Sequence, residues 1–302
     1  MAGAAFFLSK NKRGKMQKMR FVTFDIEGRP HPGVVLGDSV VDLSSLEYSS
    51  VLEIIEAGGE ARAKIDNFLR EHHPEAKHAI PSVRLRAPLM RPRKLICVGL
   101  NYRDHAEETG SEIPSVPTIF NKFATSVIGP GDAIKLPKVS KAPDYEAEFA
   151  FVIGTGGRHI QPENWREHVF GYTIVNDVSA RDYQRATTQW LMGKTFDTFA
   201  PVGPWIATAD EIEDPHALDI SLDINGEVLQ NSNTKNLIFK IPDLIAFLSS
   251  VFTLEPGDIV STGTPAGVGF ARNPQRFLKA GDTVTVHIPA IGELRNSVVE
   301  EQ

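Results

Sequence analysis

Hydrophobic and polar residues alternate in short runs over the first third of the chain, in the pattern of strands. One longer stretch has apolar residues at helical spacing and is interrupted near Gly58-Gly59. The expected elements are strands at residues 19–24, 33–36, 39–43 and 83–89 and a helix at residues 50–72. They predict a small α+β domain over residues 19–91. Pro88, Pro92 and the neighbouring basic residues mark its end.

Strand patterns come more densely in the rest of the chain, residues 92–302, and few long helices separate them. The expected strands lie at residues 94–99, 119–128, 147–153, 170–178, 218–224, 258–262 and 282–288. Asn225-Gly226 is a strong hairpin signal, and a helix is expected at residues 242–251. Many short strands with Gly and Pro turns predict a mostly β barrel or sandwich with some α structure.

Two glutamates stand at the mouth of the apolar run at residues 147–153, where buried acids are rare. Residues i and i+2 of a strand point to the same face, so Glu146 and Glu148 would direct two carboxylates at one spot. One divalent cation could bind both carboxylates and neutralise their charge. The alternative is an edge strand whose solvent face carries two acids.

Asp177 ends another apolar run and is the third metal candidate. The alternative is an Asp that caps a strand-to-turn junction. Three carboxylates without a nearby His or Cys form an oxygen site, which suits Mg²⁺, Mn²⁺ or Ca²⁺ better than Zn²⁺.

Four further stretches hold candidate chemistry. His105 and Glu108 would share a face of a helical turn, and an imidazole beside a carboxylate is a competent general base, although such a pair is more often on the surface. Arg181, Gln184 and Lys194 could hold a substrate carboxylate or a developing enolate, whereas the alternative for each is a solvated side chain. The glycine-rich turn at residues 261–269 lacks the ending of a phosphate-binding loop, but it lets backbone approach a ligand closely.

Composition limits the possible partners and the compartment. The 302 residues are 41% hydrophobic and carry a net charge of −6, which argues against nucleic acid, and no apolar run is long enough to span a membrane. The chain has a single cysteine, Cys97, so no intrachain disulfide can form, and a reducing, cytoplasmic location is predicted. Cys97 lies in an apolar run and is expected to be a buried core side chain. Residues 1–18 are basic and are read as a flexible leader rather than a secretory signal, with a targeting peptide left open.

Taken together, five stretches in this order resemble the fumarylacetoacetate hydrolase family. They lie at residues 99–108, 144–148, 176–182, 193–197 and 262–269. The resemblance implies a β core of mixed sheets, forming a roll or barrel around a divalent metal, with a smaller N-terminal domain. It also implies a homodimer.

Carried over by position, the resemblance implies that Glu146, Glu148 and Asp177 bind Mg²⁺ or Mn²⁺, with Ca²⁺ as an alternative. It implies that His105 and Glu108 activate water from a lid segment and that Lys194 polarises the substrate. Arg181, Gln184 and Thr264 resemble substrate-binding positions. Fumarylacetoacetate hydrolase itself has a further acidic ligand upstream of the histidine, whereas residues 94–102 contain no acid. The chain therefore resembles the smaller three-ligand members, such as acylpyruvases, oxaloacetate decarboxylases and isomerases of aromatic-compound breakdown.

These residues predict an enzyme that hydrolyses a carbon–carbon bond in a 2,4-dioxo acid. In this reaction His105 takes a proton from water, hydroxide attacks the distal carbonyl, and Lys194 helps to stabilise the enolate that leaves. The alternative is an oxaloacetate-type decarboxylase or a 2-hydroxy-dienedioate isomerase that uses the same site. A non-catalytic, metal-stabilised binding protein is the remote alternative.

Overall fold

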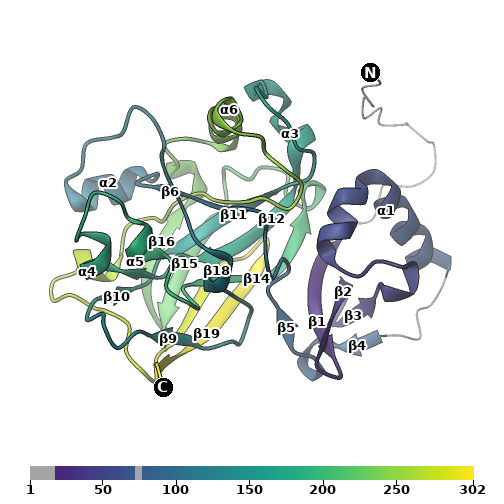
Figure 1. Cartoon of the computed structure of the whole chain (residues 1–302), viewed down its shortest axis with the longest axis horizontal. Helices are drawn as coiled ribbons and strands as arrows, with labels where there is room; N and C mark the ends of the chain where they lie inside the picture. Colours follow the sequence, from purple (N-terminus) through teal and green to yellow (C-terminus); the bar gives the residue numbers. More distant parts are fainter. Residues whose placement is uncertain (1–17, 72–76) are drawn as a thin grey trace.

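The computed structural model describes residues 18–71 and 77–302. The leader expected at residues 1–18 therefore lies outside the described residues, except for Lys18, and so does residue 72 of the expected helix. Within the described ranges, strands form a 12-stranded sheet, a 5-stranded sheet and a small two-stranded pair (Figure 1). The expected mostly β fold with mixed sheets is confirmed. The two large sheets stay open at their edges, so the barrel alternative is wrong.

The N-terminal strands and one long helix come first along the chain. Their bounds are β1 Arg20–Ile26, β2 Arg29–Leu36, β3 Ser39–Asp42, α1 Val51–Glu71, β4 Lys77–Ala79 and β5 Leu85–Arg86. Gly58 has a positive φ of 59° inside α1, so the helix is kinked where the sequence predicts a break. The strand expected at residues 83–89 shortens to β5.

The 12-stranded sheet continues from the N-terminal strands into the rest of the chain, because β1 pairs with β14. Its main path runs β4-β3-β2-β1-β14-β12-β11-β17-β6-β7. The strands outside the N-terminal part are β6 Leu95–Gly99, β7 Thr118–Asn121, β8 Val127–Ile128, β11 Ala147–Ile153, β12 Val169–Asn176, β14 Ala200–Thr208 and β17 Ile259–Ser261. The domain boundary at residue 92 stays a prediction, since one sheet spans both sides of it.

The second large sheet has the order β16-β15-β18-β19-β9 and packs on the first. Its strands are β9 Ile134–Leu136, β15 Asp219–Ile224, β16 Glu227–Asn233, β18 Thr283–Ile288 and β19 Gly292–Glu300, and the small pair is β10 Pro143–Asp144 with β13 Ser179–Ala180. Asn225 and Gly226 both have positive φ and close the predicted hairpin between β15 and β16.

Short helices surround one end of the molecule. They are α2 Arg103–Thr109, α4 Arg181–Gln184 and α5 Leu191–Lys194, whereas α3 Trp165–His168 and α6 Ile241–Val251 lie elsewhere. Figure 1 shows α2, α4 and α5 at the end opposite α1. The helix expected at residues 242–251 is confirmed as α6. Among the described residues, no helix is long and apolar enough to cross a membrane.

The strand prediction differs from the structure at residues 119–128 and at strand β14. The run at residues 119–128 is broken into β7, a 3-10 turn and β8. Strand β14 is missing from the prediction because Pro201, Gly203 and Pro204 obscure its pattern. It forms nevertheless, since β1 and β12 pair with it from both sides.

Strand β11 lies in the middle of the large sheet and is buried on both faces. Phe149 and Phe151 point into the core between the two sheets. Ala150 and Val152 point the other way, into the core that contains the apolar side of α1. Glu148 shares the face of Ala150 and Val152, as strand alternation requires. The fold thus holds a carboxylate at the start of a fully buried strand.

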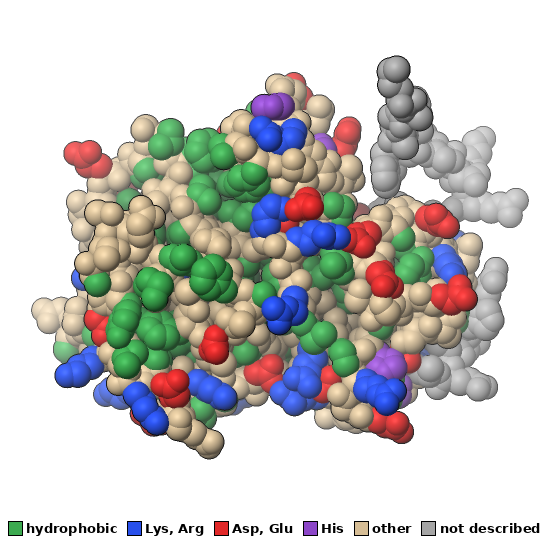
Figure 2. Space-filling view, in the orientation of Figure 1, with side chains coloured by type: hydrophobic (Ala, Val, Ile, Leu, Met, Phe, Trp, Pro, Cys, Tyr) green, Lys and Arg blue, Asp and Glu red, His purple; other side chains and the backbone are tan. Residues whose placement is uncertain are grey.

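Surface charge is mixed on the face shown in Figure 2. Lys, Arg, Asp and Glu side chains are interspersed there, and most of the hydrophobic side chains lie on the part of this face away from α1. The homodimer, the absence of a nucleic-acid or membrane partner, and the 2-oxo acid substrate stay predictions.

Candidate metal centre

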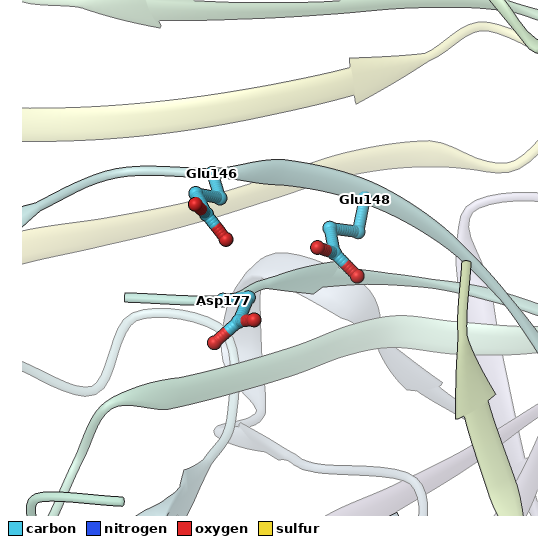
Figure 3. Close-up of side chains that lie close together, drawn as sticks. All are labelled: Glu146, Glu148 and Asp177. Atoms are coloured by element: carbon cyan, nitrogen blue, oxygen red, sulfur yellow. The ribbon is translucent and has the colours of Figure 1, made fainter. Parts of the chain in front are cut away.

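Strand register brings the three predicted metal ligands together. Ala147 of β11 lies opposite Asn176 of β12, so Glu146 and Asp177 face each other at the end of this ladder. The Asp177 amide donates to the Glu146 carbonyl at 2.9 Å. One carboxylate oxygen from each of Glu146, Glu148 and Asp177 lies within 4.8 Å of the others, and the side chains converge (Figure 3). These three residues are called the carboxylate triad below.

Glu148 is the triad member with the least compensated charge. Its side chain accepts hydrogen bonds from the Ser261 hydroxyl and, at 3.0 Å, from the Gly263 amide. No nitrogen of a Lys, Arg or His in the described part of the chain forms an ion pair with it, although it is 1% exposed. Burial, followed by the charges of Asp177 and Glu146, raises the pKa of Glu148 well above its ordinary value. A buried carboxylate in this position fits a bound cation.

The Gly263 amide reaches Glu148 because this position has no side chain. Its φ is +97°, and a Cβ there would lie 2.9 Å from the Asn101 Cβ. The glycine-rich turn thus permits the close backbone approach that the sequence predicts, although the group approached is a carboxylate of the triad.

Two buried lysines balance the other two carboxylates. Lys194 Nζ lies 2.5 Å from Glu146 Oε2 and 2.8 Å from Asp177 Oδ2. Lys122 Nζ donates to Asp177 Oδ1 and, at 2.9 Å, to the Val178 carbonyl. Burial opposes the charge of Lys194, but Asp177 and Glu146 outweigh it and raise the pKa of that ammonium.

Sequence patterns missed Lys122, which lies inside a stretch predicted as a strand. Its only signal is a lysine set between Phe120 and Phe123 in a predicted strand. A buried lysine needs a partner for its ammonium group, and for Lys122 that partner is Asp177, 55 residues further along the chain.

Arg181 is held by acids rather than left free for a ligand. Its Nε donates to Asp144 Oδ2 at 2.8 Å, and its Nη1 donates to Gln184 Oε1 at 2.9 Å. Nη2 lies 2.7 Å from Glu146 Oε1, an ion pair without good hydrogen-bond geometry. Burial would raise the pKa of Glu146, but the charges of Lys194 and Arg181 lower it to about 2. Asp144, which is buried and was not predicted as a site residue, fixes this arginine.

The predicted His–Glu pair lies on α2. His105 Nδ1 is 3.2 Å from Glu108 Oε2, and the Gly267 amide donates to Glu108 Oε1 at 2.9 Å. Asp104 anchors the same helix by accepting from Ser232 Oγ and, at 3.2 Å, from Asn236 Nδ2. Because Nδ1 faces Glu108, Nε2 is the ring nitrogen available to a substrate.

One cavity of about 670 Å³ joins these groups, and every predicted site residue except Asp177 lines it. Asp177 is fully buried behind Lys194. Thr264, from the glycine-rich turn, is held by the Gln230 amide at 2.8 Å. The structure therefore brings the predicted residues to one place, while their individual roles stay predictions.

The donor set indicates which cation the triad could hold. All three candidate ligands are carboxylate oxygens, which Mg²⁺, Mn²⁺ and Ca²⁺ prefer. Lys194 already bridges two of the carboxylates as a cation would. The residues thus fit a divalent metal, and the choice among the three ions stays a prediction.

Fold and site together define a class of β-rich enzymes with a buried carboxylate centre. The family described as fumarylacetoacetate (FAA) hydrolase, C-terminal, matches residues 94–299. The chain belongs to the fumarylacetoacetate hydrolase family. The matched residues begin close to the predicted boundary at residue 92.

Among relatives, a mitochondrial oxaloacetate tautomerase of Xenopus laevis is 44% identical over 93% of this chain and 90% of its own length. The corresponding protein of Rattus norvegicus is 45% identical over 94% of this chain and 92% of its own length. The cytoplasmic location stays a prediction, because both relatives are named as mitochondrial.

Solved structures show the same fold. The fumarylacetoacetate hydrolase of Exiguobacterium antarcticum has a TM-score of 0.81 at 36% identity and covers 94% of this chain and all of its own. The maleylpyruvate hydrolase of Sphingobium sp. SYK-6, solved with manganese(II) and pyruvate, has a TM-score of 0.80 at 33% identity and the same coverage of this chain and of its own.

Proposed function

We propose that this protein is a divalent-metal-dependent tautomerase that interconverts the keto and enol forms of oxaloacetate. The observation that carries the proposal is the buried carboxylate triad, of which Glu146 and Glu148 line one cavity together with Lys194 and His105. Such a site can remove a proton beside a carbonyl and stabilise the negative charge that develops on its oxygen. The two tautomerases, similar over nine-tenths of the chain, support oxaloacetate as the substrate.

Glu146, Glu148 and Asp177 would hold the metal, which supplies positive charge near the 2-oxo oxygen of the substrate. His105, oriented by Glu108, removes a proton from C3 through Nε2. The C3–H electron pair forms the C2–C3 double bond, and the carbonyl electrons move to the oxygen. Lys194 stabilises this oxygen with a hydrogen bond, and the imidazolium returns the proton to it. The product is the enol, and His105 is neutral again.

Carbon–carbon hydrolysis of a 2,4-dioxo acid is the second candidate. Sequence patterns favour it over an enzyme acting on oxaloacetate, whereas the relatives support the latter better. Two observations keep hydrolysis in view: the His105–Glu108 pair, which could activate water, and the similarity to a maleylpyruvate hydrolase. Decarboxylation of oxaloacetate and isomerisation of a dienedioate also pass through an enolate. Both reactions should therefore be tested in the same substrate panel.

The experiment is a substrate panel with Mg²⁺ or Mn²⁺. Loss of the enol absorbance of oxaloacetate reports tautomerisation, and cleavage of an acylpyruvate reports hydrolysis. We expect tautomerisation above the rate with metal alone. His105→Ala should lower it by roughly a hundredfold or more while Mn²⁺ affinity is kept. Acylpyruvate cleavage without any effect on oxaloacetate would replace the proposal with the second candidate.

A further inference from the structure

The cations around the cavity differ in whether an acid already neutralises them. Lys194 and Arg181 both line the cavity, but Lys194 contacts Glu146 and Asp177, and Arg181 contacts Asp144 and Glu146. These cations hold the triad and have little charge to spare for a distant part of a substrate.

Arg185 is the exception among the described residues. It follows α4, lines the cavity and is exposed, and its guanidinium has no hydrogen bond or ion pair to another described residue. It lies at the lip of the cavity, which we define as Gln184, Arg185, Thr187 and Trp190.

Phe270 holds Arg185 in place. The Arg185 guanidinium lies 4.3 Å from the centroid of the Phe270 ring, and the Arg181 guanidinium lies 4.5 Å from the same centroid. His105 packs against this ring with its centroid 6.3 Å away. One aromatic side chain thus connects the buried arginine, the exposed arginine and the histidine, and keeps the Arg185 charge beside the reaction site.

We propose that Arg185 selects dicarboxylic 2-oxo acids by binding the carboxylate distal to the 2-oxo group. This inference rests on the proposed function for the orientation of the substrate, with its 2-oxo end at the triad. The second carboxylate then points away from the buried acids, and Arg185 offers it an unshared, planar pair of donors. Thr187 lines the same lip, but its hydroxyl is hydrogen-bonded to the Gln189 backbone, so Arg185 is the charged donor there.

The test compares two unreactive ligands that differ by this one group: malate and lactate of the same hand. Both carry a 2-hydroxy acid end, and malate alone has the distal carboxylate. Calorimetry with the Mn²⁺-loaded full chain should show that the wild type binds malate at least about tenfold more tightly than lactate. Arg185→Gln should remove this preference and leave lactate affinity unchanged. Arg185→Lys should keep part of it, because charge remains but the bidentate geometry is lost.

Arg166 provides a matched control. It is also exposed and stacks on an aromatic ring, with its guanidinium 4.3 Å from the Trp165 centroid, but it does not line the cavity. Arg166→Gln should bind both ligands as the wild type does.

Equal wild-type affinities for malate and lactate would overturn the inference. The inference would also be overturned if Arg185→Gln still bound malate more tightly than lactate, or if that variant lost affinity for both ligands to the same extent. Because binding is measured without turnover, failure of the proposed reaction is seen separately. If the protein does not tautomerise oxaloacetate but its preference for malate over lactate depends on Arg185, the proposed reaction is rejected and the carboxylate-binding role of Arg185 is retained.

Discussion

The floor and the lip of the cavity are built in different ways. The floor, which we define as the carboxylate triad with Lys194, is at most 5% exposed at every residue. All of its charges except that of Glu148 have a partner among the described residues. The lip is partly or fully exposed, and its cation Arg185 is unpaired within that same part of the chain. Under the proposed function, the floor would therefore determine the class of reaction, and the lip would select the substrate.

The largest expected effect comes from removing one charge of the floor. Glu148→Gln keeps the shape of the side chain but removes a carboxylate that forms no ion pair with any Lys, Arg or His among residues 18–71 and 77–302. We expect loss of detectable Mn²⁺ binding by calorimetry and a fall in oxaloacetate tautomerisation on the order of a thousandfold. The control is Glu300→Gln, an exposed acid at the end of β19. Full Mn²⁺ affinity in Glu148→Gln would contradict its assignment as a ligand.

Lys122 should matter next, since it acts on the floor only through Asp177. Lys122→Met leaves Asp177 with one cation instead of two. We expect roughly 10–100-fold weaker Mn²⁺ binding and a loss of about 3 kcal/mol in the free energy of unfolding without metal. Urea denaturation and calorimetry measure the two effects. The exposed Lys141→Met serves as control, and unchanged metal affinity in Lys122→Met would show that this lysine does not position the triad.

The smallest expected effect is at the lip. Gln184 accepts a hydrogen bond from Arg181 Nη1 and also lines the cavity, so it connects the two regions. Gln184→Ala should raise the KM for oxaloacetate a few-fold, by roughly 1 kcal/mol of binding, while kcat and Mn²⁺ affinity change little. A large fall in kcat with unchanged KM would mean that Gln184 belongs functionally to the floor.

Sequence patterns revealed the floor better than its supports. Strand alternation put Glu146 and Glu148 on one face, and an acid at the end of the next strand pointed to Asp177; the register of β11 and β12 then made them meet. Lys122, Asp144 and Ser261 could not be found in this way, because their roles arise from contacts across the fold. The Ser261 hydroxyl reaches Glu148 over 113 residues of chain. Local periodicity carries no information about such pairs.

The same reasoning explains the errors in the fold. The hairpin at Asn225-Gly226 and the kink at Gly58 depend on local backbone preferences and were predictable. The formation of β14 depends on its neighbours, which pair with it despite two prolines. Arg185 had no distinguishing signal in the sequence, since an exposed arginine is ordinary until the fold places it over Phe270 beside the cavity.

The most direct test of the central claim is hydrogen exchange at C3 of oxaloacetate in deuterated water. Proton NMR would follow the loss of the C3 signal with Mn²⁺-free, Mg²⁺-loaded protein. We expect the wild type to exchange C3 hydrogen well above the rate with Mg²⁺ alone, and Glu148→Gln to match the Mg²⁺ rate. Exchange by the wild type that does not exceed Mg²⁺ alone would contradict the claim that the carboxylate triad, with His105, forms an enolising site.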